Sequence, residues 1–203
     1  MISKIFKRLI LIFCFLTSSF VYGNNNQSNR IEVLVNENII TKYDIIQRLK
    51  MNSILRRVEV NDENSNQILN AVIDELIVEK LKINKVEEYN IKINKDEYDQ
   101  YESRFISSHN YSKKDLEELF LINEVNYNYL TEYLEIDLKW QKLIHGLYLR
   151  VSSVTEQELS DLISKRPDLS EESASELILQ RQLDLKSIKL IKDLRDEATI
   201  EYK

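Results

Sequence analysis

One long apolar segment, Ser65–Tyr89, constrains the fold of this chain more than any other feature. Plotted at about 100° per residue, its apolar side chains form one continuous arc of roughly 220°. An ordinary surface helix carries an apolar stripe only about 100° wide. A helix with so wide an arc has to be covered on two sides, so the segment is predicted to be the central helix of a helical core. The residues on the arc are Ile68, Leu69, Val72, Ile73, Leu76, Ile77, Leu81, Ile83 and Val86.

The scarcity of glycine and proline agrees with a mainly α-helical fold. The 203 residues contain two glycines and one proline. Tight turns, β-bulges and phosphate-binding loops use glycine because it reaches positive φ without a steric penalty. A chain with so few of these residues is predicted to consist of helices joined by polar turns.

The first 23 residues have the pattern of a signal peptide. A basic start at residues 4–8 precedes the apolar run 9–16 and the short segment Val21–Gly23. We expect cleavage near Gly23 and export to the periplasm. The apolar run is short for a membrane span, which needs about 20 residues, so no stable span is expected after cleavage. Retention of the segment as an uncleaved anchor is the alternative.

The rest of the chain is predicted to be one domain over residues 31–203, after a disordered leader at 24–30. Pairs such as Thr41 with Asp44 and Asn94 with Glu97 have the spacing of helix N-caps. The expected elements are strands at 31–35, 39–40 and 199–202, and helices at 41–58, 65–90, 94–109, 112–120, 125–150, 155–166 and 170–197.

The sequence shows no pattern of an enzyme, of a metal site or of a cofactor site. The only two histidines, His109 and His145, are far apart and lack neighbouring ligands with zinc spacing. The only cysteine, Cys14, lies in the signal segment, so the mature chain has no thiolate ligand or disulfide. The formal net charge is −6, without a Lys/Arg stripe. Nucleic acid is therefore not expected as a partner.

A succession of short segments resembles the N-terminal chaperone domain of SurA-like periplasmic proteins. The order and spacing of these segments carry the resemblance, which covers nearly all of residues 31–150 and the C-terminal tail. The segments are Val35–Asn36, Ile40–Thr41 with Asp44, Glu75–Leu81, Ile91–Ile93, Tyr111–Leu116, Trp140–Leu143 and Ile200–Tyr202. The chain departs from the family at Glu37, where a turn residue is usual, and at Asn90, where glycine is common.

The resemblance implies a helical bundle in which the C-terminal helix packs back onto the N-terminal helices and the last strand pairs with the first. Family members usually carry parvulin-type prolyl isomerase domains before the C-terminal helix. Here the short connector 151–170 stands in that place, between the core 31–150 and the C-terminal part 171–203. A parvulin domain needs several glycines, and the mature chain has only Gly146.

Aromatic side chains are the candidate contacts for an unfolded peptide, because they combine a large apolar body with a polar tip. For most of them, and for Tyr133 and Trp140 in particular, a place in the core is the simpler interpretation. Tyr127 lies off the apolar arc of its helix and is the candidate expected to be exposed. The candidates are Tyr101, Phe105, Phe120, Tyr127, Tyr129, Tyr133, Trp140 and Tyr148.

The sequence therefore predicts a non-catalytic periplasmic holdase that shields unfolded outer-membrane or envelope proteins. A non-catalytic adaptor that binds one folded envelope partner is the alternative, and such a module could act as a homodimer. Prolyl isomerase activity is a third hypothesis, which a proline-limited refolding assay would test.

Overall fold

The computed structural model describes residues 29–58, 61 and 64–203. The predicted signal peptide and most of the predicted leader lie outside these residues. The elements, in chain order, are β1 (Ile31–Val35), β2 (Asn38–Thr41), α2 (Lys42–Arg56), α3 (Ser65–Glu88), α4 (Lys95–Ser108), α5 (Lys113–Ile122), α6 (Tyr127–Tyr148), the 3₁₀ turn η2 (Leu149–Val151), α7 (Glu156–Lys165), α8 (Glu171–Glu197) and β3 (Ile200–Tyr202). The fold is mainly α-helical, as predicted. No helix in the described ranges is long and apolar enough to cross a membrane.

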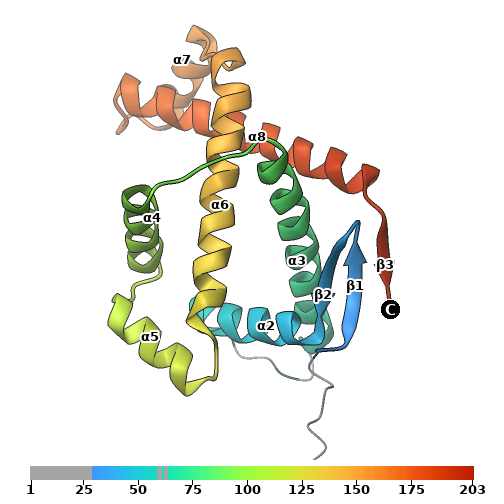
Figure 1. Ribbon diagram of the computed structural model, residues 1–203. Coiled ribbons are helices and arrows are strands. Elements are labelled where there is room, and N and C mark those ends of the chain that lie inside the picture. Colours follow the sequence, from blue (N-terminus) through green and yellow to red (C-terminus); the bar gives the residue numbers. More distant parts are fainter. Residues whose placement is uncertain (1–28, 59–60, 62–63) are drawn as a thin grey trace, which may run out of the picture.

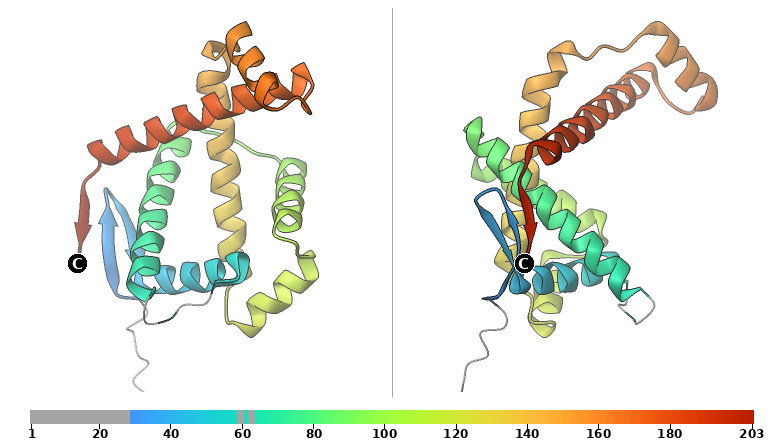
Figure 2. Two further views of the ribbon diagram at one scale, coloured as in Figure 1. Left: turned by 180° about the vertical axis from the view of Figure 1, so that it is seen from behind. Right: turned by 90° about the vertical axis from the view of Figure 1, so that its right-hand side faces the viewer.

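Four helices form an open frame (Figure 1). α3 and α6 stand side by side, α2 crosses one end of the pair, and α8 crosses the other end. α4 and α5 cover the side of α6 that faces away from α3, and α7 lies against the first part of α8 (Figure 2). α3 is covered on more than one side, as its wide apolar arc predicted, because it packs against α6, α8 and α2.

The helix boundaries follow local capping chemistry. The Thr41 hydroxyl accepts a hydrogen bond from the backbone N–H of Asp44, and the Asp44 carboxylate accepts one from the N–H of Thr41 at 2.7 Å. Equivalent capping boxes begin α4 and α7. These bonds satisfy backbone N–H groups that have no partner within the helix. After α3, Asn90 adopts φ 50°, a left-handed conformation that asparagine tolerates and glycine favours.

A small antiparallel sheet joins the two ends of the described chain. The strand order is β2-β1-β3, so β1 lies in the middle. Val33 pairs with Tyr202, and Val35 with Ile200. Asn36, at φ 51°, allows the tight turn between β1 and β2. β2 begins at Asn38, slightly earlier than expected, and the predicted pairing of the first and last strands is confirmed.

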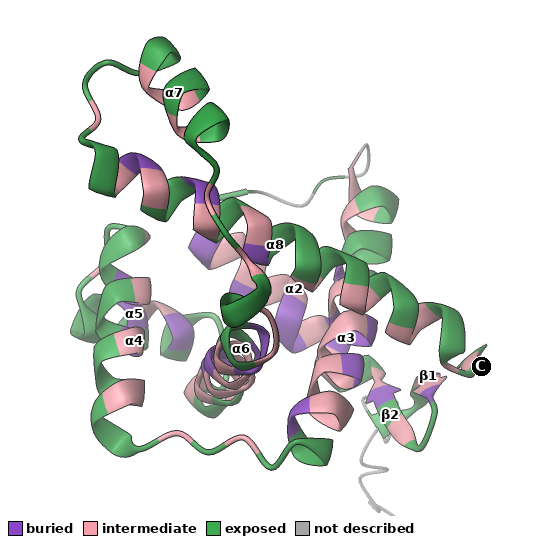
Figure 3. Cartoon of the chain, turned by 90° about the horizontal axis from the view of Figure 1, so that it is seen from above, coloured by how far each residue is buried: buried purple, intermediate pink, exposed green. Residues whose placement is uncertain are grey.

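Three apolar clusters hold the frame together (Figure 3). The first lies between the sheet, α2 and the N-terminal part of α3. The second lies between α2, α4, α5 and the first half of α6. The third joins the end of α3, the second half of α6 and α8, and contains Trp140 and Leu183. The core is therefore distributed around the frame, and the space between the clusters holds the candidate site.

Candidate functional site

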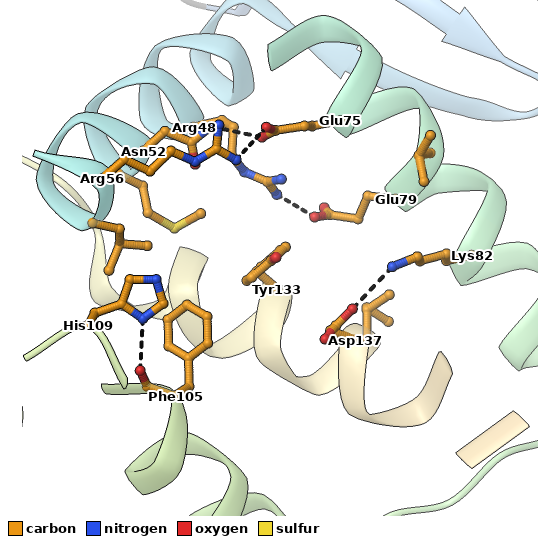
Figure 4. A pocket seen from close by; sticks show the side chains of 14 residues that line it. Arg48, Asn52, Arg56, Glu75, Glu79, Lys82, Phe105, His109, Tyr133 and Asp137 are labelled. Atoms are coloured by element: carbon orange, nitrogen blue, oxygen red, sulfur yellow. Dashed lines mark hydrogen bonds and ion pairs between the residues drawn. The ribbon is translucent and has the colours of Figure 1, made fainter. Parts of the chain in front are cut away.

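A cavity of about 250 Å³ lies between α2, α3, α4 and α6 (Figure 4). Its apolar lining comes from Met51, Leu55, Val78 and Ile136, and its aromatic lining from Phe105 and Tyr133. Small-molecule sites usually enclose about 300–1,000 Å³. The cavity is smaller than these sites and suits one or two amino-acid side chains.

Arg48 and Glu79 form an ion pair between α2 and α3 beside the cavity. Arg48 is only 2% exposed. The rings of Tyr133 and Tyr129 lie 4.8 and 5.6 Å from its guanidinium carbon, so the buried cation has aromatic neighbours. Its Nε is buried without a hydrogen-bond partner. Burial alone would lower the pKa of Arg48, but the charge and hydrogen bond of Glu79 raise it.

Further polar pairs line the cavity. Glu75 on α3 accepts hydrogen bonds from Asn52 at 2.8 Å and from Arg56 at 2.7 Å, both on α2. Lys82 on α3 forms an ion pair of 3.1 Å with Asp137 on α6. Paired cations and carboxylates therefore lie beside the apolar lining, where they can contact the backbone and polar side chains of a bound chain.

A polar network holds α4 against α6. The Tyr101 hydroxyl donates a hydrogen bond to Asp137 at 2.5 Å, and Gln141 donates one to the Tyr101 oxygen at 2.8 Å. Burial and the hydrogen bond with Asp137 raise the pKa of Tyr101. Lys142 pairs with Glu97 at 2.7 Å. Since Asp137 also binds Lys82, α3, α4 and α6 share one network.

A buried carboxylate joins α4 to α5 and α6. Glu102 is 6% exposed. It accepts a hydrogen bond from Lys113 at 2.7 Å and one from the Tyr127 hydroxyl at 3.2 Å. Because the carboxylate is paired and hydrogen-bonded, its burial is tolerated. Burial and the nearby charge of Glu102 raise the pKa of Tyr127.

The structure separates the predicted contact residues into three groups. Phe105 and Tyr133 line the cavity, with ring centroids 6.3 Å apart, and Tyr129 lies beside them at Arg48. Tyr101 and Tyr127 belong to the polar networks of α4, and Tyr148 packs with the cluster at α8. Phe120 and Trp140 are buried, at 1% and 3% exposure, and support the core.

Tyr127, which was expected to be exposed, is half-buried, as are Tyr101, Phe105, Tyr129, Tyr133 and Tyr148. Its ring centroid lies 5.6 Å from that of Phe120, and its hydroxyl donates a hydrogen bond to Glu102. The position of a residue on its own helix did not reveal that α4 and α5 cover this side of α6.

Arg48, Glu79 and Glu102 were missed by sequence reasoning. A signal existed for Arg48, which lies at helical spacing from Ile45, Met51 and Leu55 on the buried face of α2. Glu79 likewise follows Val72 and Leu76 at helical spacing. A charged residue within an apolar helical stripe indicates a buried pair between helices.

The described residues contain no group of three or more His, Cys, Asp or Glu side chains that could hold a metal ion.

A curated relative supports the resemblance in sequence. The protein named Chaperone SurA from Hydrogenovibrio crunogenus is 25% identical over 165 residues, which cover 78% of this chain and 36% of the relative. The matched part therefore spans about a third of that protein's length. No model of a protein family matches the chain.

A solved structure supports the resemblance in fold. It comes from a study of the virulence factor PEB4 and the periplasmic protein Cj1289 of Campylobacter jejuni, described as two structurally related SurA-like chaperones. It matches with a TM-score of 0.51 and 13% identity, and covers 86% of this chain and 99% of the other. At this identity the match concerns the fold alone. Together with the sequence match, it confirms that this chain is similar to the SurA-like chaperones.

Proposed function

We propose that this protein is a periplasmic holdase chaperone, and that the cavity between α2, α3, α4 and α6 receives apolar side chains of unfolded envelope proteins. The observation that carries the proposal is this cavity, with its apolar and aromatic lining and its paired charged residues, in a chain similar to SurA-like chaperones. The mature chain is proposed to begin after Gly23, with residues 151–170 in the place of the parvulin domains.

The size of the cavity sets the strength of binding. A large aromatic side chain buries about 150–250 Å². At ~25 cal/mol per Å² this burial contributes roughly 4–6 kcal/mol. Ordering an unfolded client and fixing its position costs a comparable amount of free energy. Binding at one cavity is therefore weak and reversible, as a holdase requires.

The direct test is suppression of aggregation. The purified mature chain is mixed with an unfolded outer-membrane β-barrel protein, and light scattering is followed over time. We expect suppression at stoichiometric excess. Unchanged scattering would contradict the proposal, and a single co-purifying folded protein would then favour the adaptor alternative.

A cavity-filling variant tests the site itself. Val78 lines the cavity from α3. The larger side chain of Val78→Phe fills part of the cavity, and the side chains of the apolar clusters stay unchanged. We expect weaker suppression of aggregation at unchanged helical content. Leu121→Phe is the matched control, since Leu121 is 79% exposed at the end of α5 and lies away from the cavity. Equal activity of both variants would place client binding elsewhere on the molecule.

A further inference from the structure

The middle of α8 presents an apolar face that α7 covers only in part. Leu177, Leu185 and Ile188 are 50%, 58% and 64% exposed. With Arg181 and Asp184 they lie within about 100° of the helix circumference. Figure 3 shows that many residues along α8 are exposed. Single exposed apolar residues are common, but three of them on one helix face indicate an interaction surface.

A groove runs beside this face. It lies between α7 and α8, has a volume of about 560 Å³, and contains Leu162, Leu177, Ile178 and Leu185 among its lining residues. α7 has no buried residue and contacts the rest of the structure mainly through α8. The groove therefore has room for an apolar side chain from a second helix.

We propose that the occupant is α8 of a second copy of this chain, packed antiparallel about a twofold axis between Gln182 and Leu183. In this register, Leu177 of one copy faces Ile188 of the other copy at the groove. Arg181 of one copy faces Asp184 of the other. Each contact occurs twice because the interface is symmetric, and the same helix face serves both partners.

Charge complementarity selects this arrangement over a parallel pair. A parallel pair in register brings Arg181 against Arg181 and Asp184 against Asp184, which is repulsive. The first part of α8 also carries the exposed carboxylates Glu171, Glu172 and Glu176. In the antiparallel register this part faces residues 189–194 of the other copy, which carry Lys189 and Lys192 and one carboxylate, Asp193. Glu176 of one copy then faces Lys189 of the other.

Sedimentation of the purified protein over a wide range of concentrations tests the proposal without any client. We expect a reversible monomer–dimer equilibrium. Ile188→Glu places a charge in the interface and is expected to raise the dissociation constant about tenfold or more. Leu121→Glu is the matched control and is expected to leave it unchanged. Helical content measured by circular dichroism shows whether each variant is folded.

A charge exchange tests the register. Arg181→Asp and Asp184→Arg each place like charges in the interface, so each variant alone is expected to dimerise more weakly. In a mixed dimer the aspartate introduced in one copy faces the arginine introduced in the other, and the second contact keeps its original charges. Opposite charges then meet at both contacts, so a heterodimer is expected on mixing. A monomer at all concentrations, an unaffected Ile188→Glu variant, or no heterodimer on mixing would overturn the proposal.

Discussion

Two parts of the molecule bury their charged and apolar side chains to different degrees. One is the frame, taken here as α2, α3 and α6 with α4 packed against them, and the other is the arm formed by α7 and α8. In the frame, even charged side chains such as Arg48 and Glu102 are buried and paired. In the arm, α7 has no buried residue, and α8 leaves Leu177, Leu185 and Ile188 exposed. The frame therefore pairs its buried charges within one chain, whereas the arm leaves three large apolar side chains of one helix face exposed. The difference indicates that stability resides in the frame and association in the arm.

The strongest test of this comparison removes the buried cation of the frame. Arg48→Ala leaves Glu79 without its partner and is expected to lower the free energy of unfolding by about 3–5 kcal/mol. Urea unfolding measures this loss. Lys95→Ala breaks an exposed pair with Asp99 and is expected to cost less than about 1 kcal/mol. A loss of similar size in both variants would show that burial of Arg48 does not matter.

A second test shortens one leucine in each region. Leu134 in α6 is fully buried, so Leu134→Ala is expected to cost about 2–5 kcal/mol through lost transfer energy and the cavity left behind. Leu162 in α7 is half-buried beside an open groove, so Leu162→Ala is expected to cost less than about 1 kcal/mol. Urea unfolding at low protein concentration measures the free energy of unfolding of both variants. Equal losses would mean that the arm is as tightly packed as the frame.

The smallest expected effect is a dependence of the free energy of unfolding on pH. The hydrogen bond from Lys142 and then that from the Asn94 backbone lower the pKa of Glu97. The backbone and then the side chain of Thr155 lower the pKa of Glu158 in the arm. A carboxylate with a lowered pKa in the folded state adds stability above its unfolded pKa. This stability is lost as the pH falls through the folded pKa.

Stability measured against pH for Glu97→Gln and Glu158→Gln tests this point. The difference from the unsubstituted protein is expected to be greatest near neutral pH and to vanish in acid. The Glu97 variant is expected to show the larger difference, because Glu97 also links α4 to α6. A difference that does not change with pH would rule out the ionised carboxylates as its cause.

The fold was largely predictable because the residues that begin its helices lie close together in the sequence. The caps at Thr41, Asn94 and Thr155 depend on residues three positions apart, so the sequence shows them directly. The wide apolar arc of α3 likewise required neighbours on two sides. The pairing of β1 with β3 came from the family resemblance, since residues this far apart give no local signal.

The site was less predictable, because its residues meet across helices. Arg48 and Glu79 are 31 positions apart, and Lys113 reaches Glu102 from a different helix. Periodicity separates the buried face of one helix from its exposed face, but it does not show which neighbour covers that face. For the same reason Tyr127 was expected to be exposed, and Phe120 and Trp140 were counted among the contact residues.

The pairing of β1 with β3 has a consequence for the kinetics of folding. The register joins Val33 to Tyr202, so the sheet closes a loop that contains almost all of the described chain. Closing so long a loop is entropically costly, and a high proportion of such distant contacts slows folding. During synthesis from the N-terminus, one edge of β1 stays unpaired until residues 200–202 have been made. A growing chain therefore exposes an open strand edge, which can pair with other chains, until its last strand arrives.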